Sequence, residues 1–257
     1  MVECIQDIVR EVIKMKEKIY TIPVNEAYDT DCECPMCVLE RNLEEDALGY
    51  TLGAAMMEED FRGHSDKTGY CNRHFSLLLS RQNKLPLALI LDTHMQEIRK
   101  KIAILEKHAP SGGGGLFKKK GGAFTAETEE TLRDISNGCV VCEKISATME
   151  RYADVLIYMW LNDDAFRAKF DKSKGLCLKH TMLLAKAAPK SASSHAGEFL
   201  SAVISKEKAE LDRIQDDIHR FTQKFDYRNK DMDWGTAKDA PVRTIEKISG
   251  YVRNSTD

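Results

Sequence analysis

One pattern of cysteine and histidine residues occurs twice in this chain, and it carries most of the chemistry that the sequence offers. Each copy consists of a CxxC pair followed, 34 or 35 positions later, by a CxxH pair. Three thiolates and one imidazole form a complete ligand set for a tetrahedral metal ion. We therefore predict two metal sites, with Cys34, Cys37, Cys71 and His74 in the first copy and Cys139, Cys142, Cys177 and His180 in the second.

The donor types favour zinc, with two ions per chain. Four protein ligands close the coordination shell, which is typical of structural rather than catalytic zinc. An iron–sulfur cluster also uses CxxC spacing and is the alternative cofactor. Cys32, two positions before Cys34, is a candidate extra ligand, and His64 is a candidate alternative ligand in the turn before Cys71.

Helix starts are expected to hold these ligands. Pro35 suits the first turn of a helix, which places Cys34 at its cap and Cys37 one turn inside. The positive end of the helix dipole then stabilises the thiolates. In the second copy, a helix over 142–161 would be about 30 Å long, and a short helix over 163–170 followed by extended chain to residue 176 would return about the same distance. This geometry predicts that each copy of the pattern binds its own ion.

The fold class that follows is all-α, with two pseudo-repeat helical bundles, each pinned by a Cys3His site, and a C-terminal helix. Apolar residues recur every three or four positions over 87–105, and over 200–225 with one step of seven, which indicates a further long helix in each half. A first helix is expected over 1–20, ending near Pro23. The predicted domains are a first metal-binding repeat (1–108), a Gly/Lys-rich linker (109–125), a second metal-binding repeat (126–230) and a C-terminal tail with a helix (231–257).

Composition limits the classes of partner. The chain has 257 residues, of which 42% are hydrophobic and 31% charged, and this balance is typical of a soluble globular protein. A net charge of -3 gives no general attraction to nucleic acid or to an anionic membrane. The first twenty residues do not read as a signal peptide, and the longest apolar run, 85–91, is too short for a span of about 20 residues. We expect a cytoplasmic protein with reduced thiols and no membrane partner.

Several further segments resemble one known family. They are residues 22–27 (IPVNEA), 34–37 (CPMC), 55–58 (AMME) with Arg62, 69–75 (GYCNRHF), 224–229 (KFDYRN) and 238–243 (KDAPVR). Together they are similar to the DUF6062 family of bacterial and archaeal proteins, over nearly the whole chain. The resemblance implies no activity, because that family is of unknown function. The sequence departs from the family pattern at Glu59, at Phe61 and in its Gly-rich insert.

Three functions are consistent with these residues. The first is a zinc-stabilised helical scaffold that binds a protein or a small molecule, with Glu58 and Arg62 as candidate ligand-binding residues because they are i,i+4 on a predicted helix. The second is an iron–sulfur redox or cofactor-handling protein. The third is a nucleic-acid-binding regulator, which the few basic clusters at 100–101 and 118–120 do not favour. No arrangement of a nucleophile and its base can be assigned, so no catalytic residue is predicted and an enzyme is not favoured.

Overall fold

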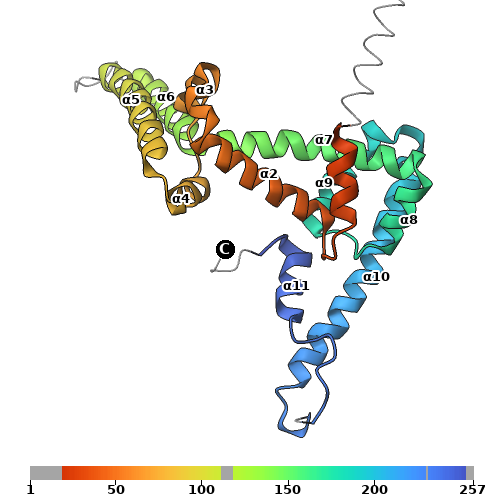
Figure 1. Ribbon diagram of the computed structural model, residues 1–257. Coiled ribbons are helices and arrows are strands. Elements are labelled where there is room, and N and C mark those ends of the chain that lie inside the picture. Colours follow the sequence, from red (N-terminus) through yellow and green to blue (C-terminus); the bar gives the residue numbers. More distant parts are fainter. Residues whose placement is uncertain (1–18, 111–117, 230, 253–257) are drawn as a thin grey trace, which may run out of the picture. The chain divides into compact units, whose positions relative to one another are not determined.

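The computed structural model describes residues 19–110, 118–229 and 231–252, and within these ranges it contains helices and no strand (Figure 1). The predicted all-α class is confirmed. Residues 19–28 are helical, and the elements that follow are α2 (Pro35–Leu52), η1 (Ala54–Met57), α3 (Glu59–Thr68), α4 (Asn72–Ser80), α5 (Lys84–His108), α6 (Lys118–Asn137), α7 (Val140–Asn162), α8 (Asp164–Lys172), α9 (Leu178–Ser191), η2 (Ser193–His195), α10 (Ala196–Gln223), η3 (Tyr227–Asn229) and α11 (Ala240–Ser249).

The chain forms two compact units whose boundaries differ from the sequential halves 1–108 and 126–230. Unit 1 combines Met1–Asn42 with Ala147–Asp257, and unit 2 is Leu43–Ser146. Helix α2 therefore starts in unit 1 and ends in unit 2, while α7 starts in unit 2 and ends in unit 1. Each half of the sequence contributes helices to both units.

The core of unit 1 is built from aromatic and aliphatic side chains of α7 to α10. Phe166, Phe170 and Phe199 are almost completely buried. The ring of Tyr28, from the helical residues 19–28, meets Phe166 edge-on with centroids 5.0 Å apart. Burial of large aromatic rings of this kind contributes much of a core's stability. Helix α11 packs against α9 and α10 and completes the unit.

Unit 2 is organised around α5, which packs against α3, α4 and α6. Its inward face carries Leu87, Ile90 and Leu105, all buried, whereas Leu91, Met95 and Ile102 of the predicted apolar stripe are exposed. His94 lies on the same helix and is also buried, where its Nδ1 is 2.7 Å from the carbonyl oxygen of Asp66 in α3. This contact ties the end of α3, which leads into the first CxxH pair, to the centre of the unit.

Several boundaries differ from the sequence-based expectations. Residues 1–18, most of the predicted first helix, lie outside the described residues, and so do residues 111–117 of the predicted linker. Pro23 does not end a helix, because residues 19–28 are helical. The last part of the predicted linker belongs to α6, which begins at Lys118. Among the described helices, none combines the length and the apolar character that crossing a bilayer requires.

Candidate metal centres

The eight predicted ligands come together as two groups of four, but the pairing of the motifs is crossed. One group is Cys34, Cys37, Cys177 and His180, and the other is Cys71, His74, Cys139 and Cys142. The prediction that each copy of the pattern binds its own ion is therefore wrong. Each CxxC pair meets the CxxH pair of the other copy, and each group lies entirely within one of the two units.

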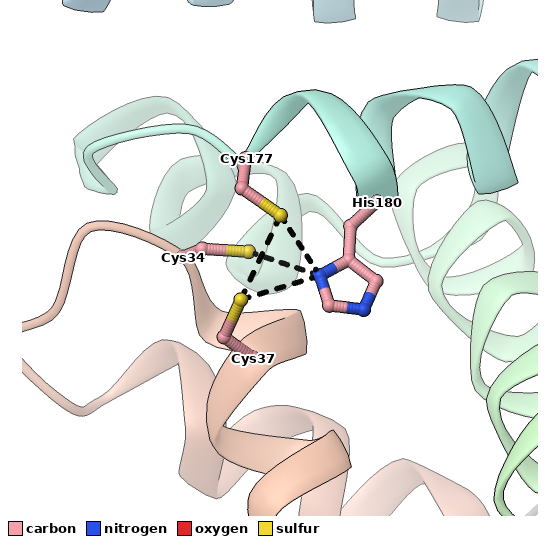
Figure 2. Close-up of side chains that lie close together, drawn as sticks. All are labelled: Cys34, Cys37, Cys177 and His180. Atoms are coloured by element: carbon pink, nitrogen blue, oxygen red, sulfur yellow. Dashed lines mark hydrogen bonds between the residues drawn. The ribbon is translucent and has the colours of Figure 1, made fainter. Parts of the chain in front are cut away.

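The group in unit 1, here called site 1, is fully buried. Figure 2 shows the imidazole of His180 directed at three sulfur atoms. Its Nδ1 lies 3.4 Å from the Sγ atoms of Cys34 and Cys37 and 3.2 Å from that of Cys177. The Sγ atoms of Cys37 and Cys177 are 3.6 Å apart. All four side chains belong to the buried class, so site 1 is closed to solvent.

The group in unit 2, site 2, has the same donors and similar distances. Nδ1 of His74 lies 3.1 Å from Sγ of Cys139, 3.2 Å from that of Cys71 and 3.4 Å from that of Cys142. The Sγ atoms of Cys71 and Cys142 are 3.9 Å apart. Site 2 is more open, because Cys142 is exposed and Cys71 is half-buried.

Both groups fit a single tetrahedral ion. An ion with Zn–S bonds of about 2.3 Å and a Zn–N bond of about 2.0 Å separates its sulfurs by about 3.8 Å and sulfur from nitrogen by about 3.5 Å. The sulfur–sulfur distances of 3.6 and 3.9 Å, and the sulfur–nitrogen distances of 3.1 to 3.4 Å, agree with these values. All donor atoms of a group lie within 4.8 Å of one another.

The lengths of the helices make pairing within the second copy difficult. From Cys142 to the end of α7 at Asn162, the chain covers about 30 Å. The return path consists of residue 163, α8 with 9 residues, and residues 173–176, and it reaches about 31 Å only if it is straight and fully extended. Gly175, with φ of +74°, bends this path and shortens its reach. The second CxxH pair meets Cys34 and Cys37 instead.

Local turns before each CxxH pair aim its ligands. Cys71 and Cys177 occupy the N-cap positions of α4 and α9, so each histidine lies one turn inside its helix. Two residues earlier, Gly69 and Gly175 both have φ of +74°. A Cβ atom at Gly69 would lie 2.5 Å from His94 Nε2, and one at Gly175 would lie 2.7 Å from Glu207 Oε1. Both the left-handed conformation and the lack of space require glycine at these turns.

Each histidine is held by a carboxylate that the sequence analysis did not identify. Glu44 Oε1 lies 3.1 Å from His74 Nε2, and Glu40 Oε2 lies 3.4 Å from His180 Nε2. The basic residue before each histidine, Arg73 or Lys179, forms an ion pair with the same glutamate. Carboxylates in this position fix the tautomer of a metal-binding histidine and make its free nitrogen a better ligand. In the sequence, the feature that both glutamate contacts share is a basic residue directly before the histidine.

The electrostatics of both sites favour a bound cation. Burial opposes protonation of His180, but the thiol groups of Cys177 and Cys37, together with Glu40, outweigh burial and raise its pKa to about 11. Burial likewise opposes protonation of His74, while Cys139 and Glu44 raise its pKa to about 10. The surrounding sulfurs and carboxylates thus stabilise positive charge at each centre. A metal dication that replaces the proton would supply that charge.

Removing the Glu44 carboxylate should weaken metal binding at site 2 selectively. In Glu44→Ala, His74 loses its acceptor, and we expect the zinc affinity of site 2 to fall by about 10- to 100-fold while site 1 is unchanged. Competition with a chromophoric chelator measures both affinities. Glu45→Ala is the matched control, because Glu45 is partly exposed and pairs with Arg81. Equal affinities in the two variants would contradict this role.

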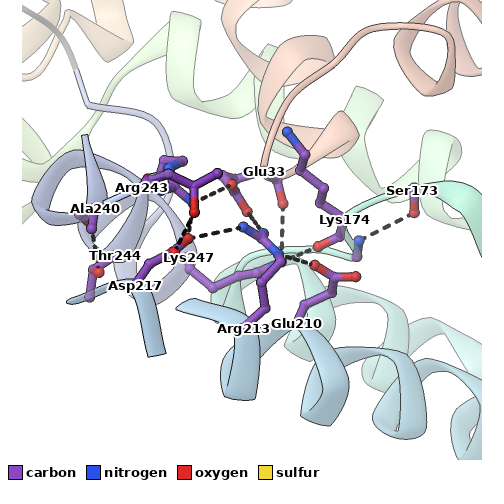
Figure 3. A network of polar contacts seen from close by, with 12 residues as sticks. Glu33, Ser173, Lys174, Glu210, Arg213, Asp217, Ala240, Arg243, Thr244 and Lys247 are labelled. Carbon is purple, nitrogen blue, oxygen red and sulfur yellow. Dashed lines mark hydrogen bonds and ion pairs between the residues drawn. The ribbon is translucent and has the colours of Figure 1, made fainter. Parts of the chain in front are cut away.

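A buried lysine of α11 ties together the two loops that deliver the ligands of site 1 (Figure 3). Lys247 has no exposed surface. Its Nζ donates to the carbonyl oxygens of Glu33 at 3.1 Å, Leu176 at 3.2 Å and Lys174. Glu33 and Leu176 directly precede Cys34 and Cys177. Lys247 therefore fixes the backbone that precedes both cysteine-containing segments of site 1.

Charged side chains continue this network around Glu33. Its carboxylate accepts a hydrogen bond of 2.5 Å from Arg213 and lies 3.7 Å from a guanidinium nitrogen of Arg243. Arg243 in turn donates to Asp217 of α10 at 2.8 Å. Both helices are thus attached to the loop before Cys34, α11 through Arg243 and α10 through Arg213 and Asp217.

The remaining predicted site residues do not join these centres. Cys32 is half-buried and lies outside both groups, and burial raises the pKa of its thiol to about 11. Glu58 has extended backbone between η1 and α3, so it does not share a helix face with Arg62. Within the described chain, Glu58 accepts a hydrogen bond from the Tyr50 hydroxyl, Arg62 donates to Thr93, and the two side chains form no ion pair. His64 pairs with Glu143 at 2.9 Å rather than with a sulfur.

Comparison with known proteins agrees with the resemblance seen in the sequence. No curated protein matches the chain, and no solved structure matches it. The model of one family matches residues 15–255, which includes all eight ligands and both glutamates. The chain therefore belongs to DUF6062, a family of unknown function.

Proposed function

We propose that this protein is a zinc-stabilised helical binding module, with one structural zinc ion in each unit. The observation that carries the proposal is the presence of two complete Cys3His groups at tetrahedral spacing. Four protein donors leave no coordination position for a substrate, which is the property of structural zinc. Zinc in such sites contributes its binding energy directly to folding.

The donor geometry favours zinc over an iron–sulfur cluster. In a cluster with several irons, different cysteines bind different irons, so the sulfurs spread over a wider span than around one ion. Here all donors of a group lie within 4.8 Å. The thiolate and imidazole set with glutamate support is also the common environment of zinc in proteins. The free state of all described cysteines fits a reducing, cytoplasmic location.

A cavity in unit 1 supports the binding role. Its volume is about 440 Å³, and it lies between the segments 28–32 and 169–174. Lys169, Lys172 and Lys174 line it together with Asp29 and Asp31. Lys169 and Lys174 pair with the two aspartates, which leaves Lys172 as the extra positive charge. A cavity of this size and charge suits a small anionic molecule.

Metal analysis after anaerobic purification tests the proposal. We expect a colourless protein with about two zinc ions per chain, because each Cys3His group holds one ion. Removal of zinc by a strong chelator should lower helicity and the melting temperature, and added zinc should restore both. A brown protein that contains iron and inorganic sulfide would instead establish the cluster alternative. Retention of full stability after complete zinc removal would disprove the structural role.

A further inference from the structure

We infer that site 2 is a peroxide-reactive zinc–thiolate site, in which Cys142 is oxidised and the ion is released, while site 1 keeps its ion. The inference rests on the proposed function, since it requires zinc in both sites. It arises from a difference between two groups that have the same donors. All four ligands of site 1 are buried, whereas in site 2 Cys142 is exposed and Cys71 is half-buried.

The two sites differ in exposure because a segment of backbone lies over the sulfurs of site 1. At site 1, Gly250 follows α11 with φ of +96°. A Cβ atom built on Gly250 would lie 3.6 Å from Sγ of Cys37 and 3.8 Å from Sγ of Cys177, so the backbone there lies directly over the sulfurs. Lys247, one turn earlier, holds α11 in this position through its three carbonyl contacts (Figure 3). Site 1 is therefore protected from solutes by the end of α11.

At site 2, Cys142 is exposed, and so is the contact of its sulfur with that of Cys71. The next residue, Glu143, pairs with His64 at 2.9 Å, and both side chains are more than half exposed. Solutes can therefore reach this side of the site. Zinc keeps a bound cysteine deprotonated near neutral pH, and the thiolate is the form of cysteine that peroxides oxidise. Cys142 combines this form with access to solvent, which the cysteines of site 1 lack.

The chemistry needs a peroxide as oxidant and Cys71 as the second thiolate. The Cys142 thiolate attacks one peroxide oxygen, the O–O bond breaks, and the leaving hydroxide takes a proton to become water. The Cys71 sulfur, 3.9 Å away, then attacks Sγ of the Cys142 sulfenic acid, and a second water leaves after protonation. The two thiolates lose two electrons in total, which reduce the peroxide. The disulfide removes two of the four zinc ligands, so the ion dissociates.

The test uses the full chain with zinc in both sites and with the two other cysteines replaced. Cys32 lies outside both groups, and Cys4 lies outside the described residues, so Cys4→Ser with Cys32→Ser leaves only cysteines that belong to the two sites. Zinc content is measured first, and a value of two per chain satisfies the proposed function independently. Hydrogen peroxide is then added in slight excess, and zinc release is followed with a chromophoric chelator.

We expect one zinc ion per chain to be released at least about tenfold faster than the second. Peptide mass mapping of the fast product should show a Cys71–Cys142 disulfide, with Cys34, Cys37 and Cys177 still reduced. A reductant followed by zinc should restore the original content. Release of both ions at the same rate, earlier oxidation of the site 1 cysteines, or no release at all would overturn the inference. A starting protein without two zinc ions would instead contradict the proposed function.

Discussion

Cys34→Ser combined with Cys177→Ser should remove one zinc ion per chain, whereas Cys34→Ser combined with Cys71→Ser should remove both. The first pair of substitutions disables only site 1, because both residues belong to it. The second pair takes one ligand from each site. A structural zinc site that loses one or two thiolates loses most of its affinity, since the remaining ligands no longer close the shell. Native mass spectrometry or metal analysis counts the ions directly.

The same two double variants are controls for each other, because each replaces two cysteines with serine. If the motifs paired within each half of the sequence, the counts would be reversed. Cys34→Ser with Cys71→Ser would then keep one ion, and Cys34→Ser with Cys177→Ser would keep none. Chelator dialysis at a fixed free zinc concentration should precede the count, so that weakly held ions do not contribute. Ion counts reversed in this way between the two double variants would disprove the crossed arrangement.

Lys247→Met should be the most damaging substitution outside the metal ligands. The substitution removes the hydrogen-bond donor of three backbone carbonyls. It also removes the cation that lies 3.7 Å from the Glu207 carboxylate. Removing one partner from a buried charged network typically costs about 3–5 kcal/mol. We expect the free energy of unfolding to fall by about this amount, with zinc lost from site 1 before site 2. Urea denaturation of the zinc-loaded protein measures the change.

Lys238→Met is the matched control for this experiment. Lys238 lies in the same C-terminal segment but is exposed, and a surface substitution of this kind usually changes stability by less than about 0.5 kcal/mol. A loss below about 1 kcal/mol in Lys247→Met would show that the buried ammonium does not hold the loops together. An equal loss of zinc from both sites would show that its effect is not local to site 1.

The eight residues of the two groups were predictable from the sequence, while the way their motifs pair was not. Spacing of i,i+3 fixes which residues of a CxxC or CxxH pair act together, because both lie in one helical turn. The 33 or 34 residues between a CxxC pair and the next CxxH pair allow either partner. Pairing within the second copy would need a straight, fully extended return from α7, and the longer α8 and the turn at Gly175 both shorten that return. Neither feature is contained in the i,i+3 spacing of the motifs.

Other differences came from contacts that a local pattern does not contain. Lys247 lies among polar residues of an amphipathic helix and would be expected at the surface, yet three carbonyls from distant segments surround it. Val242, Ile245 and Ile248 on the same helix are exposed instead. The spacing of Glu58 and Arg62 indicated a shared helix face, but the helix is interrupted at Glu58. In each case tertiary packing, and not helix periodicity, determined which side chains are buried and where the helix begins.

The crossed pairing also determines what holds the two halves of the chain together. Each half of the sequence carries three cysteines and one histidine, but its CxxC pair and its CxxH pair belong to different groups. A polypeptide with a single CxxC and a single CxxH in this topology would therefore have to dimerise to complete either group. The present chain is the covalent equivalent of that dimer. If a protease cut it between α5 and α6, both Cys3His groups would still join the two fragments, because each group takes residues from both sides of the cut.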